Sequence, residues 1–173
     1  LLKQLAESDK MKKYHELGTP ANVLPLVFSK GIPIKNLLTN EIADLKNISG
    51  ETFAENHLGR RVACSHCPVA CIHLATLRKP YEDEPYFYRT VYLSYDYELI
   101  YALGSMLGIT SSESILKLIE VVEEIGLDAI STGVILAWIT EAFEKGLINE
   151  KHTEGLIPQW GNAEAYIEII RKI

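Results

Sequence analysis

The feature that most constrains this chain is a cluster of cysteines, because all three cysteines of the 173 residues lie between positions 64 and 71. Cys64, Cys67 and Cys71 follow the spacing C-x2-C-x3-C. On a helix, offsets of three and then four residues would place the three sulfur atoms on one face. Three thiolates on one face can each bind one corner of a cubic iron–sulfur cluster, which usually has four cysteine ligands. The spacing therefore favours a cluster site that lacks one ligand.

Two other interpretations of the cysteines stay open on spacing alone. Thiolates and imidazoles bind zinc in a tetrahedron, and His66 or His73 could complete such a site. The cysteines could also simply pack against their neighbours. Pro68, directly after the second cysteine, favours the cluster, because related Cys-Pro elements shape cluster loops. The order of the spacings disfavours a radical adenosylmethionine site, which uses three intervening residues and then two.

The composition excludes several classes of protein. A hydrophobic content of 47% with 23% charged residues is typical of a globular domain. A net charge of −6 without long charge runs argues against nucleic-acid binding, which needs a basic surface. No apolar run reaches the ~20 residues of a membrane span, so we expect no membrane association. Clustered cysteines in an odd number argue against a secreted disulfide framework and predict a cytoplasmic protein.

Apolar periodicity predicts a mostly helical chain without convincing strand alternation. The clearest helix begins at the capping-box pattern of residues 110–113 and continues, with apolar residues at i, i+3, i+4 and i+7, to Ile125. Gly126 suits a left-handed C-cap, and Asp128 can cap the next helix. Further helices are expected over residues 1–14, over residues 50–58, and through Ala165 to the terminus. The predicted fold class is all-α, an irregular multi-helix domain.

Seven of the nine tyrosines lie between positions 81 and 101. Such rings commonly cover a core while their hydroxyl groups stay wet or hydrogen-bonded. The functional alternative is the wall of a substrate channel. The histidines at positions 15, 57 and 152 lie in no ligand spacing and are expected to be satisfied core or surface residues. Arg60 and Arg61 are expected to be surface residues, with the balancing of cluster charge as the alternative.

A second distinctive segment runs from Glu123 to Gly133, where the pattern predicts a helix end, a glycine turn, a carboxylate and a helix start. The carboxylate of Asp128 can cap the following helix by accepting backbone N–H bonds. It can instead accept paired N–H donors from the guanidine-like edge of a ligand. Gly126 permits the close backbone approach that either role needs.

In combination, these motifs resemble the aldehyde ferredoxin oxidoreductase family. The resemblance rests on the cysteine pattern with Pro68, on the segment after Gly126, and on two further similar stretches. These are Cys64-x2-Cys67-Pro68-x2-Cys71, Gly126-Leu127-Asp128-x-Ile130-Ser131-Thr132-Gly133, Tyr97-Glu98 leading into Tyr101-Ala102-Leu103-Gly104, and Tyr14-His15-x2-Gly18-Thr19. Almost the whole chain is covered, and the order of the motifs agrees with the family.

The resemblance implies the cofactors and partners of the family. These are a tungsten or molybdenum atom held by pterin dithiolenes (tungstopterin or molybdopterin), a nearby [4Fe-4S] cluster, a small aldehyde substrate, and ferredoxin as the electron acceptor. Cys64, Cys67 and Cys71 would be three of the four cluster ligands, and the fourth would lie beyond residue 173.

The resemblance also implies which residues contact the pterin and the substrate. The pterin contacts would come from Glu123, Gly126, Leu127 and Asp128, with Glu123 standing where the family has an aspartate. Glu98 aligns with a family glutamate close to the metal. A carboxyl group buried there would have its pKa raised by desolvation and could exchange a proton with the substrate near neutral pH. The alternative is an exposed carboxylate on a helix. Glu98 is therefore the predicted catalytic residue.

Finally, the resemblance implies that residues 1–173 are helical domains of a longer chain. The amino-terminal pterin-binding domain and the remainder of the C-terminal domain would lie outside them. The start at Leu1 and the helix expected to reach Ile173 lead to the same expectation. The parent protein would be an aldehyde-oxidising enzyme, with a homodimer left open, and this part alone would be inactive. The alternatives are a non-catalytic electron-transfer or regulatory subunit that keeps only the cluster, and a zinc-stabilised interaction domain.

Overall fold

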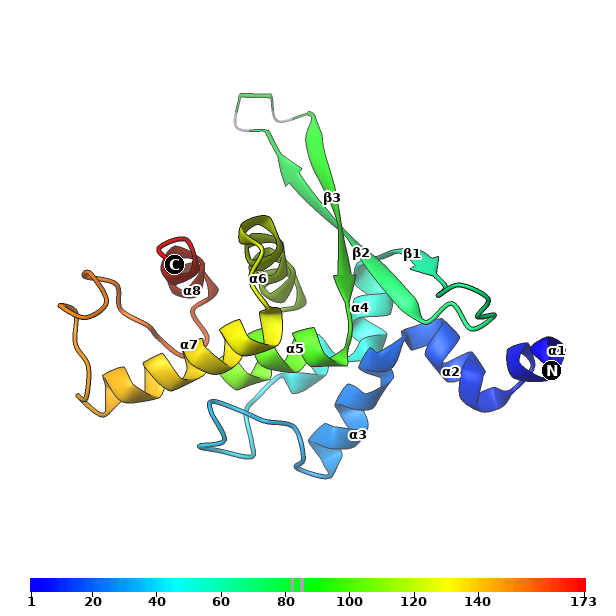
Figure 1. Ribbon diagram of the computed structural model, residues 1–173, viewed down its shortest axis with the longest axis horizontal. Helices are drawn as coiled ribbons and strands as arrows, with labels where there is room; N and C mark the ends of the chain where they lie inside the picture. The colour runs from blue at the N-terminus through cyan, green and yellow to red at the C-terminus, as the bar shows by residue number, and fades with distance from the viewer. Residues whose placement is uncertain (82, 85) are drawn as a thin grey trace.

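The structure, a computed structural model, describes residues 1–81, 83–84 and 86–173. Helices form most of the regular structure (Figure 1). The α-helices are α1 (Leu2–Ala6), α2 (Asp9–Leu17), α3 (Val23–Phe28), α4 (Gly50–Asn56), α5 (Tyr97–Leu103), α6 (Ser112–Ile125), α7 (Ala129–Glu144) and α8 (Ala163–Ile170). The short 3-10 helices are η1 (Thr19–Asn22), η2 (Leu45–Ile48) and η3 (Ser105–Leu107). The strands are β1 (Leu58–Val62), β2 (Ile72–Pro80) and β3 (Tyr88–Tyr95).

The three strands show that the predicted all-α class is wrong, because they form an antiparallel sheet in the order β1-β2-β3. Alternate residues of β2, namely His73, Ala75 and Leu77, are buried, as expected for a strand with one face on the core. The outward positions include apolar and aromatic residues such as Leu74 and Tyr92. Hydropathy therefore does not alternate along these strands although burial does, and a pattern search misses them.

The β2–β3 hairpin extends away from the helices (Figure 1). Its pairing continues without a register shift from His73 opposite Tyr95 to Pro80 opposite Tyr88. Two ion pairs connect the outer half of the hairpin to α6. Lys79 contacts the buried carboxylate of Glu120, and Arg89 lies 3.3 Å from Glu124. The hairpin is thus supported from one side by α6.

Helices α5 and α7 lie side by side in the centre of the helical part (Figure 1). Gly133 makes this close approach feasible, since a Cβ atom there would lie 2.2 Å from the carbonyl oxygen of Ala102. Helices α6 and α8 also contact each other, and the buried leucine and isoleucine residues of α5, α6 and α8 join one continuous core. The glycine of the sequence motif thus has a packing role between two helices.

The C-cap predicted at Gly126 and the N-cap predicted at Asp128 are confirmed, whereas the N-cap of α6 is Ser111 and not a capping box of Thr110 with Glu113. The Ser111 hydroxyl accepts the N–H of Ser114 at 3.3 Å at the start of α6. At its end, Gly126 adopts φ +80°, and the Leu127 N–H donates to the Val122 carbonyl at 3.0 Å, as in a Schellman motif. Other predicted bounds change. The first helix is interrupted between Ala6 and Asp9, α4 ends at Asn56, and α8 ends at Ile170 before the terminus.

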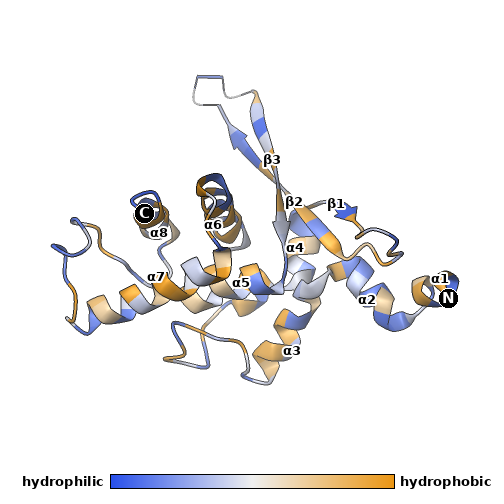
Figure 2. Ribbon diagram, viewed as in Figure 1, coloured by the Kyte–Doolittle hydropathy of each residue, from blue (hydrophilic) through white to orange (hydrophobic). Residues whose placement is uncertain are grey.

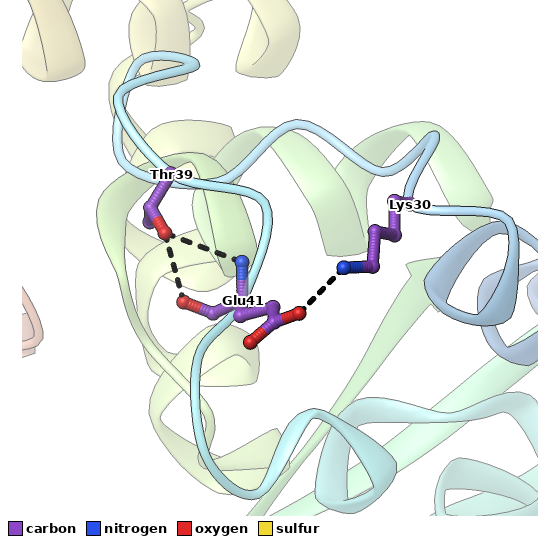
Figure 3. A network of polar contacts seen from close by, with 3 residues as sticks. All are labelled: Lys30, Thr39 and Glu41. Atoms are coloured by element: carbon purple, nitrogen blue, oxygen red, sulfur yellow. Dashed lines mark hydrogen bonds and ion pairs between the residues drawn. The ribbon is translucent and has the colours of Figure 1, made fainter.

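A long loop after α3 is closed by a polar network (Figure 3). The Lys30 ammonium group donates to the Glu41 carboxylate at 2.6 Å. The Thr39 hydroxyl donates to the Glu41 carbonyl at 3.1 Å and accepts the Glu41 N–H at 3.2 Å. The Lys30 ammonium group lowers the pKa of the Glu41 carboxyl group below its usual range. The network fixes the segment that leads to the buried residues Leu45 and Ile48.

Apolar residues recur along the helices (Figure 2), and several of them are exposed. One face of α7 exposes a stripe of large side chains: Ile130, Val134, Ile135 and Trp138. The Trp138 side chain is 60% exposed. Within the described residues, no single helix is long and apolar enough to cross a membrane, and only Tyr97–Leu107 and Ser112–Ile125, bent by 109°, reach that length and composition together.

Candidate functional site

The three cysteines lie in the loop between β1 and β2, which we call the cysteine loop (residues 63–71). The prediction that the three sulfur atoms lie on one face of a helix is therefore wrong. Pro68 has no N–H to donate to the carbonyl of Cys64, and His66 and Ala70 adopt φ values of +61° and +53°, which no right-handed helix contains. A turn remains between the first two cysteines, where the Cys67 N–H donates to the Cys64 carbonyl at 3.0 Å.

The thiols fit an iron–sulfur cluster by their chemistry and exposure. All three cysteines are free, Cys64 is exposed, and Cys67 and Cys71 are half-buried. No disulfide competes for the thiols, and a fourth ligand could approach them from solvent. Within the described residues, however, no group of three His, Cys, Asp or Glu side chains converges as around a metal ion. A cluster would therefore draw the sulfur atoms of the cysteine loop together on binding.

The surroundings of His73 argue against the zinc alternative that used this residue. His73 is buried, its Nδ1 lies 3.3 Å from the Tyr95 hydroxyl, and its Nε2 lies 3.0 Å from the His15 carbonyl. A neutral ring that donates from Nε2 and accepts at Nδ1 satisfies both contacts. Burial lowers the pKa of His73, in keeping with a neutral ring. Both nitrogen atoms are engaged, so neither is free for a metal.

Glu98 lies in the first turn of α5 and is exposed. Asp96 caps this helix by accepting the Leu99 N–H at 3.0 Å. The neighbouring Tyr97 is partly buried, and its ring lies 5.2 Å from that of Tyr101. Burial, with smaller contributions from Tyr101 and Glu98, raises the pKa of the Tyr97 hydroxyl. The structure thus places Glu98 beside a neutral phenol on an open surface.

The residues predicted to contact a pterin lie at the turn between α6 and α7. Asp128 is the N-cap of α7 and accepts the Ser131 N–H at 2.7 Å, so the simpler interpretation of this carboxylate is confirmed. The hydrogen bonds from Ser131 lower the pKa of Asp128. Glu123 is exposed, although partial burial raises its pKa. Leu127 packs against the core, while a Cβ atom on Gly126 would meet nothing within 4 Å.

One segment connects the cysteine loop to α5. Gly18 lies against Cys71, since a Cβ atom at Gly18 would be 3.2 Å from the Cys71 carbonyl oxygen. The adjacent Thr19 hydroxyl accepts the Tyr97 N–H at 3.0 Å, directly before Glu98. Helix α5 in turn contacts α7, which begins after Asp128. The predicted site residues therefore lie on three connected elements, but no hydrogen bond or ion pair joins Glu98 to Asp128 among the described residues.

The tyrosine-rich segment divides into two groups. Tyr95 is buried, and Tyr97 and Tyr101 are half-buried, as expected for rings that cover a core. Burial raises the pKa of Tyr95 to about 12. The remaining tyrosines are exposed on or near the β2–β3 hairpin: Tyr81, Tyr86, Tyr88 and Tyr92. The interpretation as core cover holds for the first group only, and the channel wall stays a prediction for the second.

Two residues near the site gain a role that sequence patterns do not reveal. His15 Nδ1 lies 2.8 Å from the carbonyl of Val69, inside the cysteine loop. Arg61 Nε donates to the His15 carbonyl at 2.9 Å, so Arg61 binds the backbone of another element. His15 and Val69 are 54 residues apart, so no local sequence pattern marks their contact. Only the family-like segment that contains His15 pointed to this residue.

Comparison with known proteins shows the family of this chain. The family described as "Aldehyde ferredoxin oxidoreductase, domains 2 & 3" matches residues 1–173, the whole chain. The chain belongs to the aldehyde ferredoxin oxidoreductase family. The resemblance seen in the motifs is therefore confirmed.

Individual relatives support the assignment. A tungsten-containing aldehyde ferredoxin oxidoreductase of Pyrococcus furiosus is 36% identical over 144 residues, which cover 81% of this chain and 22% of the relative. Its counterpart in Thermococcus kodakarensis is 33% identical over 82% of this chain and 22% of the relative. An aliphatic sulfonate oxidoreductase, WOR-like subunit, of Pyrococcus furiosus is 31% identical over 94% of this chain and 25% of the relative. This chain thus spans about a quarter or less of the length of these relatives.

Proposed function

We propose that residues 1–173 form part of a tungsten- or molybdenum-pterin oxidoreductase that oxidises aldehydes to carboxylic acids. The observation that carries the proposal is the family match over the whole chain, which includes a loop of three free thiols. The aldehyde oxidoreductase relatives are named as tungsten-containing, which favours tungsten. The activity would belong to the longer protein, with ferredoxin as electron acceptor and a cytoplasmic location.

In the proposed reaction, an aldehyde and a water molecule give a carboxylic acid, two protons and two electrons. The electrons reduce two ferredoxin molecules, one at a time. When bound, the pterin-held metal supplies two-electron chemistry and the [4Fe-4S] cluster supplies one-electron transfer. Cys64, Cys67 and Cys71 would hold three corners of this cluster. Glu98 would accept or release one of the protons once the substrate side of α5 is closed off from water.

The turn between α6 and α7 would bind the pterin. Asp128 is exposed, and the hydrogen bonds from Ser131 lower the pKa of its carboxyl group. An ionised carboxylate with free lone pairs can accept N–H donors from the edge of a pterin while it caps α7. Gly126 leaves open space beside it, Leu127 anchors the turn in the core, and Glu123 stands at its other side. This residue set fits a planar ligand rich in N–H groups.

The exposed apolar face of α7 supports the placement of this chain in a larger assembly. A stripe of Ile130, Val134, Ile135 and Trp138 exceeds what isolated surface residues explain, and such patches mark protein interfaces. A longer parent protein, with its pterin-binding domain, would supply polypeptide to cover it. The relatives contain such additional chain, since the matches cover 22–25% of their lengths.

A second candidate is the non-catalytic subunit that keeps only the cluster. The specific observation in its favour is that Glu98 and Asp128 are both exposed, whereas a catalytic carboxyl group is normally enclosed. One relative is itself named as a subunit of an aliphatic sulfonate oxidoreductase. Aliphatic sulfonates are thus the alternative substrate class if the parent protein is catalytic.

Activity of the parent protein separates these candidates. Full-length protein, purified without oxygen, is assayed with aldehydes and with aliphatic sulfonates, using ferredoxin or a one-electron dye as acceptor. Aldehyde-dependent reduction that falls at least tenfold in Glu98→Gln supports the proposal. Activity with aliphatic sulfonates but not with aldehydes would show that sulfonates are the substrate class. Protein that contains a cluster but reduces the acceptor with neither substrate would establish the subunit.

A further inference from the structure

The cysteine loop is attached to the rest of the protein at its centre by one side chain. His15 Nδ1, on α2, lies 2.8 Å from the carbonyl oxygen of Val69, so the ring donates a hydrogen bond there. Val69 stands between Cys67 and Cys71. Among the contacts of the described residues, this is the hydrogen bond that ties the interior of the cysteine loop to another element. The imidazole therefore restrains the half of the loop that carries two of the three thiols.

The backbone of His15 is held just as firmly by the strands on both sides of the loop. Its carbonyl accepts Arg61 Nε from β1 at 2.9 Å and His73 Nε2 from β2 at 3.0 Å. This carbonyl belongs to the last turn of α2, where helix carbonyls lack partners within the helix. Two strand side chains satisfy it, so the end of α2 is fixed where the side chain of His15 reaches Val69.

The residue after α2 completes this arrangement. Gly18 adopts φ +66°, which suits only glycine at the observed ψ of −164°. A Cβ atom on it would lie 3.2 Å from the Cys71 carbonyl oxygen and 3.3 Å from His73 Nδ1. The chain can thus leave α2 directly against Cys71. His15 and Gly18 together bring α2 against the second half of the cysteine loop.

We propose that His15 is a positioning residue for the cluster ligands: its Nδ1–H bond to Val69 fixes the Cys67–Cys71 half of the cysteine loop. The purpose of this restraint rests on the proposed cluster function, whereas the restraint itself does not. A restrained half loop has less chain entropy left to lose when a cluster binds. Cys64 lies three residues before Cys67, outside the restrained half, and is exposed already.

Thiol reactivity in the metal-free full-length protein tests the restraint. Each cysteine is alkylated under reducing, anaerobic conditions, and the rate at each site is read from peptide masses. In His15→Ala, Cys67 and Cys71 should react about fivefold faster, the factor that corresponds to one ordinary hydrogen bond. The rate at Cys64 should stay within twofold. His15→Asn, whose amide nitrogen can take the place of Nδ1, should return both rates close to those of the natural chain.

Two controls keep this test specific. His152→Ala removes an exposed histidine that bonds to the nearby Asn149. Both residues are remote in sequence from the cysteine loop, so this variant should change no thiol rate. A variant that merely loosens the whole fold is recognised by two signs. Its melting temperature is lower, and all three thiols react faster. Unchanged rates at Cys67 and Cys71 in His15→Ala, or a failure of His15→Asn to restore them, would overturn the proposal.

Cluster loading in the full-length parent protein connects the restraint to its purpose. After anaerobic reconstitution, His15→Ala should retain less iron and show a weaker visible charge-transfer band than the natural protein, and His15→Asn should recover both. Equal iron content in all three proteins would overturn the role in positioning ligands. If the natural protein takes up no iron, the proposed cluster function fails, while the thiol rates still decide whether His15 restrains the loop.

Discussion

The contact between α5 and α7 gives a sharp test, because Gly133→Ala adds one methyl group at a place without room. The new Cβ atom would lie 2.2 Å from the Ala102 carbonyl oxygen and 2.6 Å from its carbonyl carbon. Contacts under 3.0 Å are essentially never seen for a real Cβ atom, so the helices must separate by ~0.8 Å. Both neighbouring atoms belong to the backbone, so no side chain can rotate away.

The magnitude follows from two opposing effects. Replacing glycine by alanine inside a helix stabilises it by about 1 kcal/mol through helix propensity. Overpacking a close contact costs about 1–3 kcal/mol, and more when backbone must move. We therefore expect a net loss of about 2 kcal/mol in the free energy of unfolding, and a melting temperature lower by about 4–8 °C.

Thermal unfolding followed by circular dichroism measures this change. The near-ultraviolet signal of the tyrosines on α5 should change as well, because the helix shifts. Gly146→Ala is the control, since Gly146 has φ +69° but a Cβ atom there meets nothing within 4 Å. It should lower the melting temperature without altering the near-ultraviolet signal. A Gly133→Ala variant as stable as the natural chain would refute the close packing of α5 on α7.

Two further predictions concern buried polar groups. His57 is half-buried, its Nε2 lies 2.8 Å from the Ser112 hydroxyl, and burial lowers its pKa below 6.5. The folded chain then binds fewer protons than the unfolded chain, so His57 supports stability above pH ~6.5 and loses this effect as the pH falls. Melting temperatures at pH 7.5 and 5.5 should differ less in His57→Gln than in the natural chain, and equal differences would contradict this. Lys79→Ala leaves the Glu120 carboxylate, 2% exposed, without its cation and should cost about 3 kcal/mol in chemical denaturation, partly recovered by adding Glu120→Gln. If Lys79→Ala alone unfolds at the same denaturant concentration as the natural chain, water reaches the Glu120 carboxylate and the prediction is wrong.

Local chemistry explains which parts of the fold could be predicted. The caps at Gly126 and Asp128 depend on side-chain and backbone groups within a few residues, so the sequence pattern was sufficient. The predicted capping box missed the N-cap of α6 by one residue, since Ser111 takes that place. The sheet depends on pairing between distant segments. Its outward face carries Leu74 and Tyr92, which removes the hydropathy alternation that would have marked it.

The candidate site shows the same division. Motif identity located the cysteines and the turn at Asp128, and the family match confirms the resemblance that they carried. The helical conformation predicted for the cysteine loop was wrong. Although the three thiols have helical spacing, Pro68 and two residues with positive φ prevent a helix there. The contact between His15 and Val69 joins residues 54 positions apart and could only come from the structure.

The central claim is that Cys64, Cys67 and Cys71 are ligands of a [4Fe-4S] cluster in a tungsten- or molybdenum-pterin protein. The most direct measurement is metal and sulfide analysis of the anaerobically purified full-length protein, together with its visible spectrum. The account predicts about four irons and four sulfides per chain, tungsten or molybdenum, and a broad charge-transfer band that Cys67→Ser weakens. Zinc without iron, or a spectrum unchanged by Cys67→Ser, would contradict it.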